Sequence, residues 1–299
     1  MKISSKKEFI DNKLVSQIRD RFADMIIGKC EIFHSYPIDH KAWKKQHGRN
    51  WECSSLADAF SKYWWHGSFG ENSKKLTALS NELKSVIDEK EGSEHGVFRA
   101  CVKILDWGQV YRGSIGYLVE RYESGELSTS IRHACCILDG EKLRTGPFED
   151  GTLRLDSGMT KIYSLYCTTS IIYDDRVASA IALIVVQLFG ISTSEEISRE
   201  LRLLKIFGHG DKKKQRVIGD NFSYGISRSN HARFNLLANW LIDGAISKAI
   251  VDDKSSIERI WEVKLSGKDE GLDGRNTLRR KIESALFMIG SDVNTRNPR

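Results

Sequence analysis

The organisation of this chain is clearest in residues 153–190, which read LRLDSGMTKIYSLYCTTSIIYDDRVASAIALIVVQLFG. The polar turn DSGMT precedes Lys161, Ile162, Leu165 and Tyr166, whose spacing is that of a helix. We therefore predict one short helix there. A second helix is expected from about Val177, because the run that begins there is strongly apolar. Asp174 lies just before this run, at an N-cap or first-turn position. Lys161 and Asp174 are thirteen residues apart and precede or begin two helices, so that their side chains can converge on one site.

Apolar residues recur at helical spacing through much of the remaining chain. Proline is also rare: the sequence holds three, whereas average usage gives about fifteen, and proline interrupts helix interiors. The spacing is clearest in five runs: Ile10–Ile26, Leu79–Ile87, Ile197–Leu204, Leu236–Leu241 and Leu278–Ile289. We therefore predict an all-α, or nearly all-α, fold.

Two segments break this helical pattern. Residues 126–157 are rich in Gly, Ser, Thr and Asp, and we expect a few short strands or turns there. Residues 207–230 form a basic, glycine-marked stretch that is expected to be a loop. The breaks suggest two helical lobes, joined through the first segment and with the chain returning through the second. Along the sequence we divide the chain into an N-terminal helical region, a core, and a C-terminal helical region with a frayed basic tail: residues 1–96, 97–250 and 251–299.

Composition limits the possible partners and location. The chain has 299 residues, a net charge of +6 and a pI near 8.9, which suit a phosphate-rich partner without proving one. No apolar run follows the first lysines, so we expect no secretory signal. The longest apolar stretch, Val177 to Ile191, is shorter than the ~20 residues that span a bilayer and is expected to be a buried helix. A cytoplasmic protein that does not enter the membrane is the expectation.

The cysteines give no sign of a metal centre. The six cysteines form no CxxC pair and show no ligand-like spacing with histidine, so neither zinc nor an iron–sulfur cluster is indicated. Reduced thiols are expected in a cytoplasmic compartment. Nucleotide-binding and serine-hydrolase motifs are also missing from the sequence.

Two short motifs in the quoted segment resemble those of the helix-hairpin-helix DNA glycosylases. SGMTK, residues 157–161, is similar to the glycine-rich hairpin, Gly-x-Gly-Thr-Lys in the 8-oxoguanine branch. IIYDDRV, residues 171–177, is similar to the segment that carries the catalytic aspartate of that superfamily. Bacterial proteins of the 8-oxoguanine-glycosylase-like fold have close versions of both, and the resemblance covers about residues 97–242. The chain departs from the pattern at Ser157, which replaces the first glycine, at the short interval between the motifs, and at the second acid, Asp175.

The resemblance implies a two-lobed, helix-hairpin-helix glycosylase-like bundle and a set of site residues. Asp174 would be the catalytic carboxylate and Lys161 a possible nucleophile, with double-stranded DNA that contains a modified base as the substrate. It implies no cofactor, no metal and a monomer. Some relatives would repair oxidised guanine, while others would remove a bulky modified cytosine from phage DNA in antiviral defence; the departures favour defence slightly. The turn from Ser157 to Thr160 is expected to present backbone N–H groups to a phosphate, as helix N-termini generally do. The candidate DNA contacts are Ser157, Gly158, Thr160 and Arg176. Trp107 and Gln109 are candidates for lining the base pocket.

The residue types suit this chemistry. Cleavage of an N-glycosidic bond passes through an oxocarbenium-like transition state, which a carboxylate beneath the sugar stabilises. A desolvated lysine amine can attack C1′ and form a Schiff base, which adds abasic-site lyase activity.

Simpler interpretations stay open at every position. Asp174 can serve only as a helix cap, Lys161 can be an ordinary surface lysine, and Trp107 can be packing at a boundary. The whole chain can also be a non-catalytic DNA-binding module of a defence or restriction system, or a helical scaffold that binds no DNA. The basic run Lys212–Lys214 is either a solvated loop or a clamp on the DNA backbone.

Overall fold

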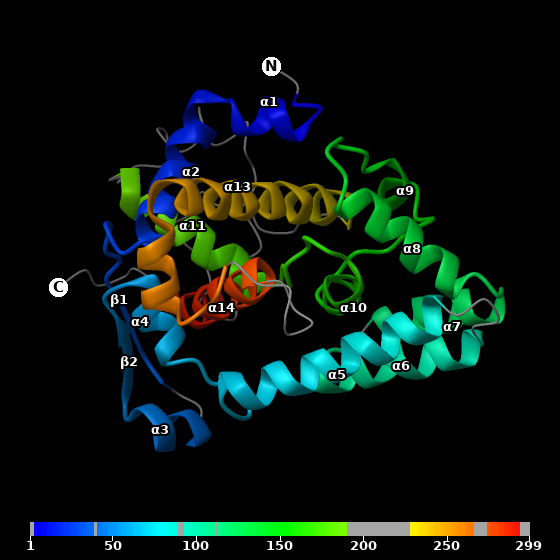
Figure 1. Ribbon diagram of the computed structural model, residues 1–299. Helices are drawn as coiled ribbons and strands as arrows, with labels where there is room; N and C mark the ends of the chain where they lie inside the picture. The colour runs from blue at the N-terminus through cyan, green and yellow to red at the C-terminus, as the bar shows by residue number, and fades with distance from the viewer. Residues whose placement is uncertain are drawn as a thin grey trace. The chain divides into compact units, whose positions relative to one another are not determined.

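The structure, a computed structural model, describes residues 3–38, 41–88, 93–111, 113–189, 228–265 and 274–293. Within these ranges the chain is mostly helical, with one two-stranded antiparallel sheet (Figure 1). The predicted all-α fold class is confirmed.

The chain divides into two compact units, each assembled from separate stretches of sequence. The first unit consists of Met1–Lys7, Gly67–Asp174 and Ser227–Asn239, as far as these are described. The second consists of Glu8–His66, Asp175–Ile226 and Trp240–Arg299, with the same restriction. The sequence suggested consecutive regions, whereas the two units alternate along the chain.

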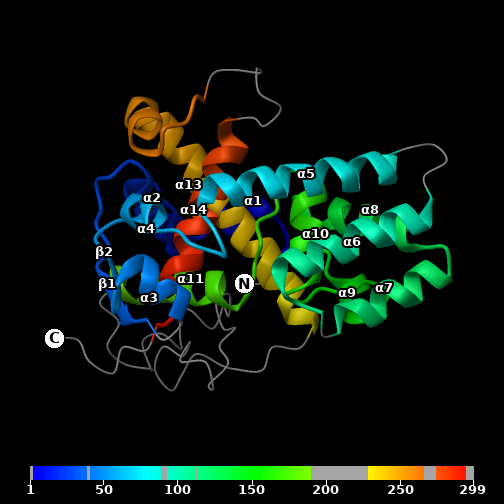
Figure 2. The ribbon, with the colours of Figure 1, turned by 90° about the horizontal axis from the view of Figure 1, so that it is seen from below.

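The first unit is a helical bundle. Among its packed pairs, α5 contacts α6 and α10, and α6 contacts α7 and α8; these helices can be followed in Figure 2. Its core is apolar and includes Leu83, Ile104 and Ile162, which are fully buried. The helices are α5 (Phe69–Asp88), α6 (Glu94–Gly108), α7 (Ser114–Glu123), α8 (Leu127–Leu138), α9 (Gly146–Glu149), α10 (Met159–Tyr166) and the first part of α13 (Arg228–Trp261).

The second unit combines helices with the small sheet. In the sheet, His34 faces Cys53 and Tyr36 faces Trp51, and the last two rings stack with centroids 4.9 Å apart. The helix α14 packs against α4 and α11. The elements are α2 (Lys13–Ile26), β1 (His34–Pro37), α3 (Lys41–His47), β2 (Asn50–Cys53), α4 (Leu56–Ser61), α11 (Asp175–Phe189), the rest of α13, and α14 (Gly274–Ile289); α1 (Lys6–Ile10) spans the boundary between the units.

The predicted helical runs are mostly found. The runs in the regions of α5, α13 and α14 are helical as expected. The run Ile10–Ile26 is divided at Asn12, whose side chain accepts hydrogen bonds from the backbone N–H groups of Leu14 and Val15 and caps α2. The run Ile197–Leu204 lies outside the described residues.

Residues 126–157 were expected to hold a few short strands or turns, and turns are found in residues 139–157, beside the short helix α9. Residues 127–138 form the helix α8, although Ser and Thr are frequent there, because Leu127, Ile131 and Leu138 face the core of the first unit. The segment holds one isolated bridge, between Lys142 and Ser5, and the two strands of the sheet lie instead at β1 and β2. The loop predicted at 207–230 lies outside the described residues up to the start of α13.

The apolar run after Asp174 is the helix α11, and its residues from Val177 to Val185 are buried, as predicted. No helix in the described part of the chain has the length and apolar content needed to cross a bilayer. The expectation of reduced thiols was wrong for two cysteines, since Cys135 and Cys167 form a disulfide. Among the described residues, no cluster of three or more His, Cys, Asp or Glu side chains is placed to hold a metal ion.

Candidate active site

The start of α10 is fixed by Asp156. Its Oδ1 accepts hydrogen bonds from the backbone N–H groups of Gly158, at 3.0 Å, and Met159, at 2.9 Å. Burial by itself would raise the pKa of this carboxyl, but the hydrogen bonds from Ser114 and Met159 and the positive charge of Arg154 outweigh burial and lower the pKa. The first turn of α10 is therefore held by an ionised side chain.

These contacts change the role predicted for the SGMTK turn. The N–H groups of Gly158 and Met159 already donate to Asp156, and the N–H of Thr160 donates to the Asp156 carbonyl at 2.9 Å. Phosphate binding by these amides was therefore a wrong expectation, because their donors are used inside the protein. Close packing explains the glycine at position 158 instead, since a Cβ there would collide with the Ser114 hydroxyl.

Lys161 points into the protein from the first turns of α10. Its Nζ donates to the carbonyl oxygen of Ser157 at 3.0 Å, one helical turn earlier, and lies 3.5 Å from Oδ2 of Asp174. The aliphatic stem passes Gly108, at the end of α6, where a Cβ would lie 2.5 Å from Lys161 Cδ. The surface-lysine interpretation is wrong, because only 7% of the Lys161 side chain is exposed.

Asp174 completes the pair. It immediately precedes α11, and 9% of its side chain is exposed. The positive end of a helix dipole favours a carboxylate at such a position. The geometry thus brings together, in one nearly enclosed place, the two residues that the sequence singled out thirteen positions apart.

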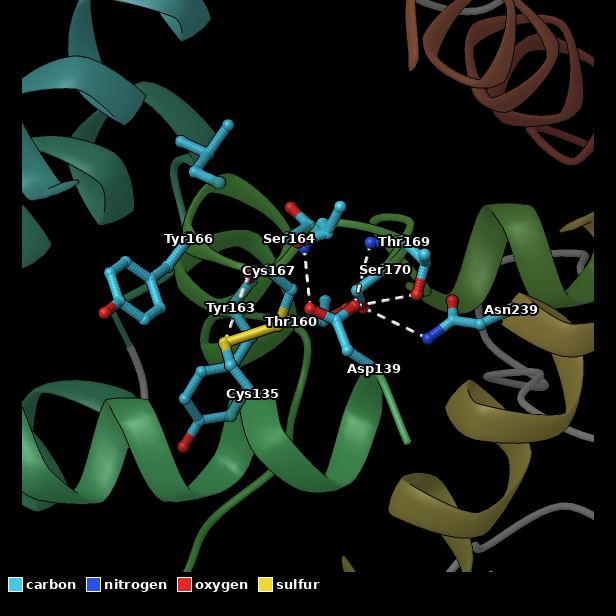
Figure 3. Close-up of a disulfide and its surroundings, with 12 residues drawn as sticks. Cys135, Asp139, Thr160, Tyr163, Ser164, Tyr166, Cys167, Thr169, Ser170 and Asn239 are labelled. Carbon is cyan, nitrogen blue, oxygen red and sulfur yellow. Dashed lines mark hydrogen bonds between the residues drawn. A yellow bond between two sulfur atoms is a disulfide. The ribbon is translucent and has the colours of Figure 1, made fainter. Parts of the chain in front are cut away.

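The segment between Lys161 and Asp174 is anchored to α8. Cys167, the residue after α10, is bonded to Cys135 of α8. Asp139, the residue after α8, accepts hydrogen bonds from the N–H groups of Thr168 and Thr169 (Figure 3). The hydroxyl of Thr169 also donates to Asp139, at 2.7 Å. The C-terminal end of α8 and the residue after it therefore hold the beginning of the loop that leads to Asp174.

Thr160 was predicted to contact DNA, but its side chain is not available for such a contact. It is fully buried, and its hydroxyl accepts hydrogen bonds from Tyr173 N and Asn235 Nδ2, each at 2.9 Å. The same hydroxyl donates to the Ile171 carbonyl at 3.4 Å. Its hydrogen-bonding capacity is therefore used within the first unit. Ser157 is half-buried, and its contact with DNA stays a prediction.

Trp107 and Gln109, proposed for the base pocket, flank the glycine that contacts Lys161. The indole N–H of Trp107 donates to Asn72 Oδ1 at 2.9 Å, and its ring is half-buried. Gln109 is exposed and ends α6 in the left-handed region, with φ 53°. Such a conformation is uncommon for a residue with a side chain. Their backbone is thus placed close to Lys161, while their contact with a base stays a prediction.

Arg176 belongs to the second unit, where aromatic rings surround it. Its guanidinium carbon lies 4.3 Å from the ring centroid of Phe287, 5.4 Å from Trp43 and 5.5 Å from Trp65. Nη1 also lies 3.3 Å from the Ser291 hydroxyl. Cation–π packing therefore accounts for this side chain, and its predicted contact with DNA is untested.

Sequence reasoning missed three polar residues on α13 that contact this region. His231 donates from Nε2 to the carbonyl oxygen of Tyr173 at 3.0 Å, and burial lowers its pKa. Asn235 and Asn239 were not singled out, although both are buried. Two asparagines four positions apart inside a strongly apolar stretch were a usable signal, because a buried amide needs partners.

Comparison of this chain with protein-family models, with curated proteins and with solved structures found no match. The residues of the site and their geometry are therefore the basis for assigning a function to this chain.

Proposed function

We propose that this chain is a DNA glycosylase, which flips a modified base out of the duplex and cleaves its N-glycosidic bond. The observation that supports this most is the pairing of Lys161 with Asp174 at 3.5 Å, with 7% and 9% of the two side chains exposed. A hydrolase of this class needs a carboxylate in a place with little water, and its lyase variants need an amine beside it.

In the hydrolytic reaction Asp174 stabilises the positive charge that develops on the sugar. The bond between C1′ and the base nitrogen breaks, the base leaves with the electron pair and takes up a proton, and water adds to C1′. The carboxylate also orients this water and accepts its proton. The product is an abasic site.

Lys161 supplies a second route. Its neutral amine attacks C1′ and displaces the base, and Asp174 Oδ2 is close enough to accept the proton that the amine must lose. The C1′–O4′ bond of the resulting amino sugar then breaks, O4′ takes up a proton, and a Schiff base forms between C1′ and Nζ. Loss of a proton from C2′ of this Schiff base expels the 3′ phosphate and cleaves the strand. The Ser157 carbonyl, 3.0 Å from Nζ, orients the amine before the reaction.

The substrate is a nucleotide in an extrahelical conformation. Because the pair is almost enclosed, the sugar reaches it only when the packing over Lys161 opens, and Gly108 lies in that packing. Gln109 is next to Gly108 and exposed, and its amide offers the donor and acceptor that a base edge requires. Excision of oxidised guanine in repair and excision of a bulky modified cytosine in antiphage defence are the two candidate settings.

The test is a release assay on a panel of duplexes that contain oxidised guanine, uracil or hydroxymethylcytosine, together with glucosylated phage DNA. Free base and abasic sites are measured for the unmodified protein, Asp174→Asn and Lys161→Ala. Asp175→Asn is the matched control, because it removes the neighbouring acid only. We expect release from one substrate, loss of release in Asp174→Asn alone among the two aspartate variants, and loss of strand cleavage in Lys161→Ala.

A non-catalytic DNA-binding module is the alternative, and the same pair gives it some support. A buried ion pair can be purely structural, holding α10 against the loop before α11. In that case the protein binds DNA in a salt-sensitive manner and releases no base from any duplex. That result would replace the enzyme proposal.

A further inference from the structure

The helix α13 carries three polar residues on one face, at intervals of four: His231, Asn235 and Asn239. All three lie in the first unit, and their exposed fractions are 3%, 0% and 1%. Burial of a side-chain amide is costly unless its donors and acceptor are used. We name these residues the polar face of α13, and their partners explain why they are polar.

Two members of the polar face hold the loop that leads to Asp174. Asn239 accepts from the backbone N–H of Ile171 at 3.0 Å and donates to the Ser170 hydroxyl at 3.2 Å (Figure 3). His231 donates to the carbonyl oxygen of Tyr173 at 3.0 Å. The backbone is thus fixed on both sides of Ile172, just before the carboxylate.

The third member acts on α10. Asn235 donates to Thr160 Oγ1 at 2.9 Å and accepts from Asn239 Nδ2 at 3.0 Å. Thr160 Oγ1 also accepts from the Tyr173 N–H at 2.9 Å. Thr160 directly precedes Lys161, and Tyr173 directly precedes Asp174. One hydroxyl group therefore joins the immediate neighbours of both residues in the pair.

We propose that Thr160 and Asn235 are positioning residues that set the separation of Lys161 and Asp174, an inference that rests on the glycosylase function proposed above. Neither touches the reacting atoms; they act through the adjoining backbone. The positions of two catalytic groups must be fixed to within a fraction of an ångström. Surrounding residues whose hydrogen bonds are all satisfied are the usual means of fixing them. Valine has nearly the shape of threonine, so the space at position 160 does not by itself require a hydroxyl.

The first test compares Thr160→Val with Thr160→Ser. Valine has nearly the shape of threonine and removes the hydroxyl, whereas serine keeps the hydroxyl and removes the methyl group. With the duplex that the unmodified protein cleaves, we expect Thr160→Val to lower kcat about 10- to 100-fold, with KM unchanged within about twofold, while Thr160→Ser keeps most of kcat. Equal losses in the two variants, or a change confined to KM, would overturn the positioning role.

Asn235→Ala provides a second variant if Thr160→Val does not fold. It removes the donor to Thr160 but leaves the Tyr173–Thr160 hydrogen bond in place. We expect an intermediate fall in kcat at unchanged KM. A fall in thermal stability with kcat unchanged in folded protein would show that Asn235 serves the core alone.

Another measurement separates this inference from the proposed function. In protein labelled with ¹³C-lysine, the Cε resonance of Lys161, assigned with Lys161→Arg, is recorded at one pH. Thr160→Val should displace this resonance in the same direction as Asp174→Asn, because the carboxylate has moved from the amine, while Thr160→Ser should overlay the unmodified protein. If no duplex is cleaved but this pattern holds, the glycosylase proposal fails and the positioning of the pair stands. A Thr160→Val resonance that matches the unmodified protein overturns the positioning.

Discussion

Gly108 lies directly against the side chain of Lys161: a Cβ at position 108 would be 2.5 Å from Lys161 Cδ and 2.9 Å from Cε. The neighbour is a flexible side chain, so that an added methyl group displaces the lysine before it disturbs the backbone. Gly108 therefore keeps open the space through which Lys161 reaches Asp174.

Gly108→Ala should separate activity from stability. Replacing a helical glycine by alanine raises the free energy of unfolding by as much as about 1 kcal/mol. This gain offsets the cost of moving the lysine, so the net change in the free energy of unfolding should be less than about 1 kcal/mol. Trapping of the Schiff base with borohydride should fall about tenfold or more, because Nζ is displaced. Gly116→Ala is the control, since nothing lies within 4 Å of a Cβ there. Equal trapping in the two variants would contradict the role of Gly108 in leaving space for Lys161.

The Lys161–Asp174 pair should behave as a buried ion pair. Lys161→Met and Asp174→Asn each leave one charge without the partner it has 3.5 Å away, and removal of one partner from a buried pair costs about 3–5 kcal/mol. The double variant should lose less than the sum of the single losses. Urea unfolding of the four proteins gives the coupling energy. Additive losses would mean that the two side chains do not interact.

Stability should fall in mild acid because of His231. Burial lowers the pKa of this imidazole below its ordinary value of 6.5, so the unfolded chain binds a proton before the folded chain does. The contribution of neutral His231 to the free energy of unfolding is complete above about pH 6.5. It decreases below that pH, by at most about 1.4 kcal/mol per pH unit. The folded pKa of His34 is also lowered by burial, so some slope should persist without His231.

Unfolding free energies from pH 7 to pH 5 test this prediction. His231→Gln keeps an N–H donor for the Tyr173 carbonyl and should have a shallower slope than the unmodified protein. The exposed His133→Gln is the control variant. An unchanged slope in His231→Gln would mean that His231 titrates alike in the folded and unfolded chains.

The Cys135–Cys167 disulfide should stabilise the first unit. It closes a loop with a sequence separation of 32 residues, and loops of this size correspond to about 3.7 kcal/mol. Dithiothreitol should lower the free energy of unfolding by about that amount. A variant with both Cys135→Ala and Cys167→Ala should not respond to the reductant, whereas exposed Cys136→Ser should respond like the unmodified protein. Six reactive thiols in unreduced, denatured protein would show that the bond is absent.

Several helices of this chain, though not α8, and the location of its candidate site could be predicted from the sequence because both depend on local patterns. Apolar residues at helical spacing predict α5 and α14 without knowledge of their partners, and the Asp174–Asp175 pair marks the beginning of α11. The short helix that bears Lys161 follows from the turn before it. Local spacing also placed lysine and carboxylate near enough to meet.

The tertiary structure alone decided what surrounds that pair. Thr160 contacts Asn235, 75 positions away, and Ile171 contacts Asn239, 68 positions away, and no periodicity predicts such pairs. The same holds for the disulfide and for Asp156, whose carboxylate takes the N–H donors expected to bind phosphate. Burial made the difference: once a polar group leaves water it must find a partner inside the protein, and only the packed fold determines which one is within reach.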